Sequence, residues 1–124
     1  MNIIVKNDGT ERNFRMPYSM VQNSIKLKNL LNSGETITIT DVEIDVFNTF
    51  INLFSEYYNN ETDVNTTIET IIDNILTSKF QNLQMKLMIF ITNYEFTEIH
   101  EIFKQKMHDL INNNDLSKIQ TIFV

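Results

Sequence analysis

The chain contains no cysteine and no tryptophan, only two glycines and one proline, and no long hydrophobic run. The absence of cysteine excludes disulfides, thiolate zinc sites and cysteine nucleophiles. Because Gly9 and Gly34 are the only glycines, no glycine-rich loop is present that could cradle a phosphate. No stretch approaches the roughly 20 apolar residues that span a bilayer.

Basic side chains are also scarce. The chain has ten Lys and Arg residues and sixteen Asp and Glu residues, which gives a formal net charge of -6. This balance repels phosphate backbones and anionic membrane surfaces, so we expect neither nucleic acid nor a membrane as a partner. The short apolar run after Met1 lacks the basic lead and cleavage site of a secretory signal, so we expect a cytoplasmic or nuclear protein.

Side chains that could carry chemistry do not form a recognisable set. His100 and His108 lie eight residues apart on one expected helix, without the acidic pair that would complete a metal site. Glu95, Glu98 and Glu101 fall near the start of that helix, where carboxylates favour the helix dipole and are usually solvated. We therefore expect no catalytic residue, no metal and no cofactor.

The amino-terminal pattern predicts a β-hairpin. Ile3 and Val5 alternate with polar residues, Asn7-Asp8-Gly9 is a turn signal, and a second alternating run ends at Met16. The strictly alternating, β-branched residues 36–40 predict a third strand. With 124 residues, 42% hydrophobic content and 21% charged content, the chain is expected to form one globular domain, residues 1–124.

Helical patterns fill the remainder of the chain. Pro17 suits the start of a short helix over 18–23, and Ser24 is placed to cap the next helix. Thr40 and Glu43 have the spacing of a capping box, with Asp41 as the alternative cap, before a long helix that ends at Tyr58. Gly34 is expected to terminate the helix that Ser24 caps.

Four more helical segments are expected, over residues 68–76, 83–94, 97–112 and 115–124. The run from Leu87 to Ile91 is apolar on every side, which fits either a central strand or a helix buried all round, and its length favours the helix. Residues 97–112 and 115–124 each carry one apolar stripe. Asn112, Asn113 and Asn114 separate them and favour a turn.

The order of these elements predicts an α+β fold in which a small three-stranded mixed sheet is capped by a cluster of helices, as in the BTB/POZ superfamily. We divide the domain into a core, residues 1–96, and carboxy-terminal helices, residues 97–124. These last two helices, whose apolar stripes can be covered only by the domain itself or by another protein, are expected to bind a partner.

Several segments resemble the S-phase kinase-associated protein family, the adaptors of cullin-RING ubiquitin ligases and relatives of elongin C. They are the opening strand and turn, the Ser-containing second helix, the Asp-Val pair before the long helix, an Asn-Tyr pair and the final apolar segment. In this chain they occupy Ile3–Gly9, Gln22–Leu31, Asp41-Val42, Asn93-Tyr94 and Ile119–Val124.

The resemblance implies a non-catalytic adaptor that bridges a cullin amino-terminal domain and an F-box-type substrate receptor. Asn93 and Tyr94 match the family's cullin-binding pair, and tyrosine suits an interface because its amphipathic ring gives a large contact area. The other interpretation of Tyr94 is that it merely ends a buried helix.

The resemblance also places a receptor-binding face on the carboxy-terminal helices. The residues that it implies there are Ile99, Phe103, Met107, Leu110, Ile119, Ile122 and Phe123. The family's chains continue into a helix with a Trp-Cys pair that this sequence lacks, so the expected receptor groove is abbreviated and takes a reduced F-box or a shorter partner helix.

A second hypothesis remains beside the adaptor. The same apolar surfaces would let a BTB-type module associate with itself as a homodimer or tetramer. Both hypotheses describe a protein-interaction domain, and they differ in whether the partner is a second copy.

Overall fold

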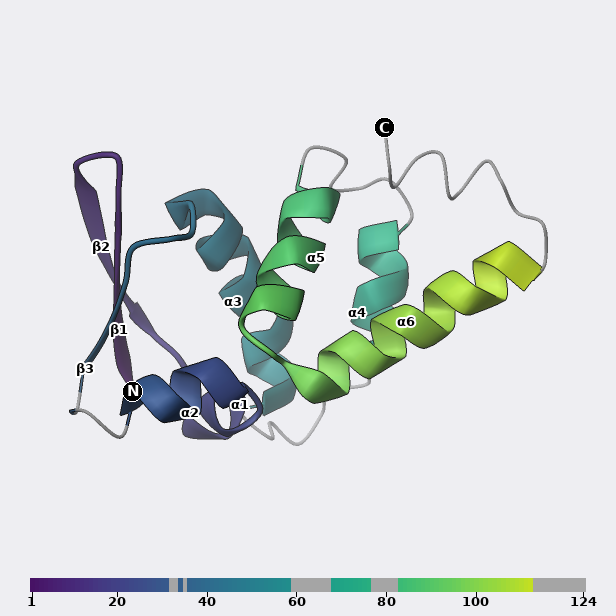
Figure 1. The fold of residues 1–124 in the computed structure, drawn as a ribbon, viewed down its shortest axis with the longest axis horizontal. Helices are drawn as coiled ribbons and strands as arrows, with labels where there is room; N and C mark the ends of the chain where they lie inside the picture. Colours follow the sequence, from purple (N-terminus) through teal and green to yellow (C-terminus); the bar gives the residue numbers. More distant parts are fainter. Residues whose placement is uncertain (32–33, 35, 59–67, 77–82, 113–124) are drawn as a thin grey trace.

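In a computed structural model, the protein is an α+β domain with a sheet at one end and helices beyond it (Figure 1). The α+β class and the small three-stranded mixed sheet predicted from the sequence are confirmed. No helix among the residues that the structure describes is long and apolar enough to cross a membrane. The described residues are 1–31, 34, 36–58, 68–76 and 83–112, with side chains through Asp109.

The sheet has the strand order β2-β1-β3. Strands β1 (Asn2–Asn7) and β2 (Thr10–Arg15) are antiparallel, and β3 (Thr36–Ile39) runs parallel to β1. The hairpin turn is tight because Asp8 and Gly9 both adopt positive φ, 51° and 77°, the backbone of a type I′ turn. One face of the sheet is buried through alternate residues of all three strands, namely Ile3, Val5, Phe14, Ile37 and Ile39.

An aromatic cluster joins the sheet to the helices. Helix α3 (Ile44–Tyr58) carries Phe47 and Phe50 on its buried face. The ring centroid of Phe47 lies 4.9 Å from that of Phe14 in β2, and the ring of Phe50 lies 4.9 Å from Phe90 and 4.7 Å from Phe96. These spacings are those of favourable aromatic pairs, so the cluster fixes α3 between the sheet and the later helices.

The start of α3 differs from the predicted capping box. The helix begins at Ile44, so Glu43 precedes the helix and cannot be its third residue. Instead the Glu43 carboxylate accepts a hydrogen bond from Lys86 at 3.0 Å. The alternative cap, Asp41, accepts hydrogen bonds from Tyr94 and Lys26. Both carboxylates are engaged by distant residues, which local spacing does not reveal.

Helix α5 (Gln84–Asn93) confirms the predicted helix over the apolar run but corrects its environment. It is not buried all round. Leu87, Phe90 and Ile91 are buried, whereas the side chains of Met85 and Ile89 are 40% and 52% exposed. Among the described residues, α3 and α6 pack against α5, and Met85 and Ile89 lie on a side of the helix that these two neighbours leave exposed.

The chain turns sharply between α5 and α6. Glu95 adopts φ 55°, the Glu95 N–H donates to the carbonyl of Thr92, and the Phe96 N–H donates to the carbonyl of Ile91, both at 3.2 Å. This pair of bonds defines a Schellman cap, with Ile91 and Phe96 both buried beside it. Glycine is the usual residue at the left-handed position, and here glutamate occupies it.

The turn is held by Ser24, which lies between α1 (Tyr18–Gln22) and α2 (Ile25–Leu31). The buried Ser24 hydroxyl donates to the carbonyl of Tyr94 and accepts a hydrogen bond from the Leu27 N–H at 3.0 Å. The Ile25 N–H donates to the carbonyl of Glu95 at 3.2 Å. Ser24 therefore caps α2, as predicted, and also ties α2 to a segment 70 residues later in the chain.

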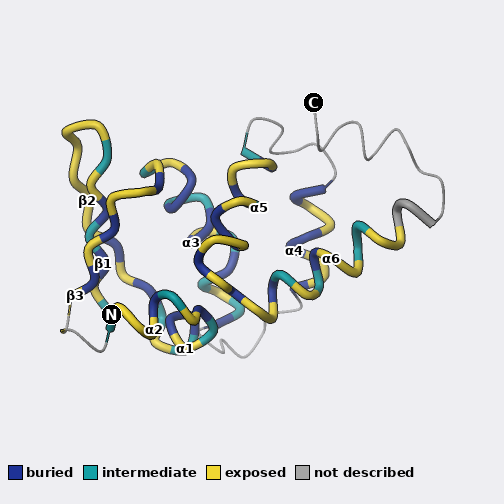
Figure 2. Tube along the Cα trace, viewed as in Figure 1, coloured by how far each residue is buried: buried dark blue, intermediate teal, exposed yellow. Residues whose placement is uncertain are grey.

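Helix α6 (Thr97–Asn112) has the bounds predicted from the sequence. It packs against α4 (Ile68–Asn74) and α5, and the Lys106 ammonium forms an ion pair with Asp73 of α4 at 3.2 Å. Buried positions lie near the start of α6, and exposed positions dominate toward its end (Figure 2). The helix expected over 115–124 lies outside the described residues.

We expect Ser24→Ala to lower the free energy of unfolding by about 2 to 3 kcal/mol, because it removes a helix cap and leaves the buried Tyr94 carbonyl without its donor. Urea denaturation measures the effect. Thr49→Ala is the control, since the Thr49 hydroxyl donates to the Asp45 carbonyl of its own helix at an exposed position, and its loss should change stability by less than about 0.5 kcal/mol. Equal stability of the two variants would contradict this account of Ser24.

Candidate functional site: two grooves beside helix α5

Tyr94, one of the two residues implied to bind a cullin, lies inside the domain. Its side chain is 3% exposed, and its hydroxyl donates a hydrogen bond to Asp41. The ammonium of Lys26 lies 4.3 Å from the centre of the Tyr94 ring and 3.1 Å from the Asp41 carboxylate. The ring thus forms a cation–π contact as well as a hydrogen bond. This burial agrees with the interpretation that Tyr94 ends a buried helix.

The electrostatics of this cluster keep it in one charge state. Burial and the hydrogen bond to Asp41 raise the pKa of the Tyr94 hydroxyl far above its ordinary value. Partial burial of Asp41 disfavours its charged form, but hydrogen bonds from Tyr94 and Lys26 and the positive charge of Lys26 outweigh it, so the pKa of Asp41 is lowered. At neutral pH a neutral tyrosine therefore donates to an ionised aspartate.

Asn93, the other implied cullin-binding residue, is exposed. It lines a shallow groove of about 170 Å³ between the start of α3 and helix α5, which we call the α3–α5 groove. The lining residues come from the turn before α3, from α3 and from one side of α5, and they are Asp41, Val42, Glu43, Val46, Lys86, Ile89, Phe90, Asn93 and Tyr94. The structure therefore brings Asn93 and Tyr94 into one groove, with Asn93 presented outward and Tyr94 within the domain.

The sequence reasoning missed three residues of this surface. Ile89 is exposed apolar surface, and Lys86 and Glu43 form an ion pair across the groove at 3.0 Å. The one signal for Ile89 was the apolar run itself, because a helix that is apolar on every side needs cover on every side. Within the described part of the chain, α3 and α6 contact α5, and Ile89 lies on a side of α5 that they leave exposed.

The implied receptor-binding residues divide into two groups. Ile99 and Phe103 are 0% and 3% exposed and belong to the core, so the expectation that both lie open to a partner is corrected for Ile99. Phe103 nevertheless lines a groove, and Met107 is partly buried beside the core and lines the same groove. The side chain of Leu110 and residues Ile119, Ile122 and Phe123 lie outside the described part of the chain.

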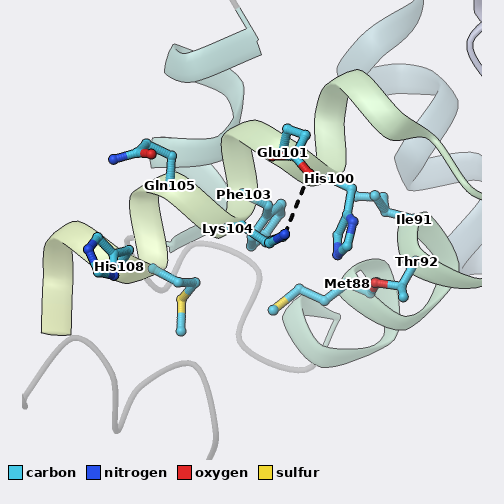
Figure 3. Close-up of a pocket in the computed structure, with 10 residues that line it drawn as sticks. Met88, Ile91, Thr92, His100, Glu101, Phe103, Lys104, Gln105 and His108 are labelled. Carbon is cyan, nitrogen blue, oxygen red and sulfur yellow. Dashed lines mark hydrogen bonds and ion pairs between the residues drawn. The ribbon is translucent and has the colours of Figure 1, made fainter.

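This second groove, the α5–α6 groove, has a volume of about 450 Å³. Its apolar lining consists of Met88 and Ile91 from α5 and Phe103 and Met107 from α6. Figure 3 shows Met88 and Thr92 facing His100 and Lys104 across the opening. The remaining lining residues are Glu101, Gln105 and His108. A concave apolar floor with a polar edge is the form of surface that receives a helix.

The titratable residues of these grooves do not form a metal site. Within the described residues, no group of three or more His, Cys, Asp or Glu is placed to hold a metal ion. His100 and His108 both line the α5–α6 groove, at positions eight residues apart on α6.

We expect Tyr94→Phe to lower the free energy of unfolding by about 0.5 to 1.5 kcal/mol at neutral pH, the usual net value of a hydrogen bond. Because the folded-state pKa of Asp41 is lowered, its contribution is present above the ordinary carboxyl pKa of about 3.9 and is lost as the pH falls through the lower folded-state value. The difference between wild type and Tyr94→Phe should therefore shrink in acid.

Urea denaturation at neutral and at acidic pH measures this difference. Tyr57→Phe is the matched control, because the Tyr57 hydroxyl donates to Glu98 at 3.3 Å on the exposed surface, and exposed contacts of this kind contribute little. If Tyr94→Phe were as stable as Tyr57→Phe at neutral pH, the cluster would not hold the end of α5.

Comparison with protein family models and with curated proteins finds no match for this chain. The residues, their packing and the two grooves beside α5 are therefore the basis for a functional conclusion.

Proposed function

We propose that this protein is a non-catalytic adaptor that bridges a cullin amino-terminal domain and an F-box-type substrate receptor within a BTB/POZ-like fold. Two features support the proposal. The first is the resemblance of the sequence segments to the S-phase kinase-associated protein family. The second is the pair of grooves on either side of α5, which would let one helix contact two partners at once.

The observation that carries the proposal is an exposed ridge along α5. Met85, Ile89 and Asn93 follow one another at four-residue steps, so they lie in one row on the helix. All three are exposed, with Met85 and Ile89 contributing apolar surface. We call this row the α5 ridge. Exposed apolar side chains that are grouped mark protein interaction sites more often than scattered ones do.

Tyr94 takes a different role in this proposal from the one implied by the resemblance. Its buried ring and its bond to Asp41 fix the carboxy-terminal end of α5. Asn93 precedes it directly and belongs to the ridge. Tyr94 is thus a positioning residue for Asn93, and the cullin would contact Asn93 and Ile89.

If the protein is this adaptor, Ile89→Asp should abolish binding to a cullin amino-terminal domain, because the substitution places a charge in the centre of an apolar contact. Isothermal titration calorimetry against purified cullin amino-terminal domains measures the affinity, and circular dichroism checks the fold. Tyr18→Asp is the matched control, since Tyr18 is a 59% exposed apolar side chain on α1. Equal affinity of both variants, or no binding by wild type, would overturn the cullin assignment.

The alternative function, a self-associating BTB-type module, is favoured by one separate observation. Tyr18 on α1 and Ile25 on α2 are 59% and 43% exposed. These two helices therefore carry exposed apolar surface that is separate from the α5 ridge. A homodimer through this surface would be isologous.

Light scattering across micromolar concentrations separates the two functions. The adaptor proposal predicts a monomer for wild type and for Tyr18→Asp. The self-association hypothesis predicts a wild-type dimer that Tyr18→Asp dissociates and that Ile89→Asp leaves intact.

A further inference from the structure

Strand β2 forms one edge of the sheet. In the order β2-β1-β3, β1 is its one neighbour among the described strands. Figure 1 shows the sheet at one end of the molecule, with α6 toward the other end. Most residues of β2 are exposed, namely Thr10, Glu11, Arg12, Asn13 and Arg15. An edge strand presents backbone N–H and C=O groups that can bond to a further strand, and β2 is therefore a place where this sheet can be extended.

The register of the hairpin determines which backbone groups of β2 face the free edge. Asn7 and Thr10 flank the two-residue turn, and residues in this position exchange hydrogen bonds. Bonded and non-bonded pairs alternate along an antiparallel ladder. The Met16 N–H donates to the Met1 carbonyl at 3.0 Å, which continues the alternation beyond β2. The residues whose N–H and C=O groups point away from β1 are therefore Glu11, Asn13 and Arg15.

The side chains at these three positions are complementary to those of a second copy of the chain. Consider two β2 strands that run antiparallel about a two-fold axis at Asn13. Asn13 then faces its own counterpart, and Glu11 of each copy faces Arg15 of the other. All three facing pairs use outward-pointing backbone groups, so the two copies exchange about six hydrogen bonds. Each carboxylate lies directly across from a guanidinium, where opposite charges attract.

The charges also disfavour the neighbouring registers. A pair centred on Arg12 sets Arg12 against its own counterpart, and pairs centred on Glu11 or on Arg15 do the same for those residues. Like charges directly opposite one another are destabilising. A pair centred on Phe14 sets Asn13 against Arg15 and gains no ion pair. The register centred on Asn13 is therefore the one in which opposite charges meet at both ends.

The present contacts of these charged side chains leave them accessible. Glu11 lies 3.6 Å from Lys6 of β1, and the two side chains are 58% and 55% exposed, so this pair contributes little to stability. A second copy would set Arg15 on the other side of Glu11, between strands. Among the ion pairs of the described residues, none involves Arg15. Residues 2–15 carry three basic and two acidic side chains, so this edge is not acidic although the chain is.

We propose that this protein self-associates weakly by antiparallel pairing of β2 with β2 of a second copy, which joins two sheets into one. The contact involves two six-residue strands, so it belongs with the small, weak interfaces. We expect a dissociation constant on the order of 100 µM to 1 mM, above the micromolar range in which the adaptor is a monomer.

This inference goes beyond the proposed function. The paired strands include no residue of the α5 ridge or of α6, so each copy keeps both of its grooves. A dimer would therefore carry two of each binding surface and gain avidity toward a partner that presents two sites.

Sedimentation equilibrium of the full chain at low salt, from about 10 µM to 1 mM, measures the association. Wild type should show a monomer–dimer equilibrium that weakens as salt screens the exposed charges. Arg15→Glu and Glu11→Arg should each weaken it at least about tenfold, because each sets like charges opposite one another at both ends of the pair. Lys104→Glu is the matched control, since it makes the same charge change on an exposed side chain of α6 and should associate as wild type does.

An equimolar mixture of the two β2 variants gives the sharpest test. One variant has glutamate at both positions and the other has arginine at both, so pairing between them sets opposite charges together at both ends. The mixture should form a heterodimer about as tightly as wild type forms its homodimer. Misfolding of either variant cannot produce this result. Net charge cannot produce it either, because both variants remain negatively charged and repel one another.

Three results would overturn the inference. They are a wild-type chain that is monomeric up to about 1 mM, a dimer that the single variants leave intact, and a mixture of the variants that stays monomeric. A dimer that Tyr18→Asp dissociates would instead place self-association on α1. Cullin binding is measured separately through Ile89 on α5, so this inference and the proposed function can fail independently.

Discussion

The hydroxyl group of Ser24 is the contact on which the arrangement of the later helices depends. It donates to the carbonyl of Tyr94 and accepts from the N–H of Leu27, so it joins the end of α5 to the start of α2. The adjoining bond from Ile25 to Glu95 and the left-handed backbone of Glu95 complete the joint. A turn that places a non-glycine residue at positive φ is held by its surroundings, and these surroundings come from the first quarter of the chain.

Fixing the end of α5 determines what the helix exposes. The aromatic cluster covers the face of Phe90, and α6 leaves the joint at Thr97 and packs along α4 and α5. Two faces of α5 are thereby covered, and in the part of the chain that the structure describes the α5 ridge of Met85, Ile89 and Asn93 is exposed. The two grooves follow from the same geometry, because each lies where α5 meets one neighbour. In the proposed adaptor, the hydrogen bonds of this joint would position both binding surfaces.

Local sequence patterns were sufficient where the structure depends on neighbours in the chain. The hairpin, the cap at Ser24 and the bounds of α6 all follow from spacing and turn chemistry. Local sequence patterns were insufficient to predict contacts between distant segments. The bond from Ser24 to the Tyr94 carbonyl and the bond from Tyr94 to Asp41 join residues 70 and 53 positions apart, and periodicity carries no information about such pairs.

The candidate site shows the same division. An apolar stripe on 97–112 was predicted, but the pattern could not say that Ile99 faces the core while Met107 lies at a groove. Likewise Asn93 and Tyr94 are neighbours in the sequence with opposite environments, one exposed and one buried. Which apolar residue is left for a partner depends on how many helices surround it, and that number is a property of the assembled fold.

The central claim is that α5 contacts two different partners on two sides, and methyl NMR of the chain with labelled Met and Ile side chains tests it most directly. On addition of a cullin amino-terminal domain, the account predicts that the methyl signals of Met85 and Ile89 shift while those of Met88 and Met107 stay in place. On addition of a receptor helix, it predicts the reverse. Shifts confined to Ile25 on α2, or identical shifts with both partners, would contradict it.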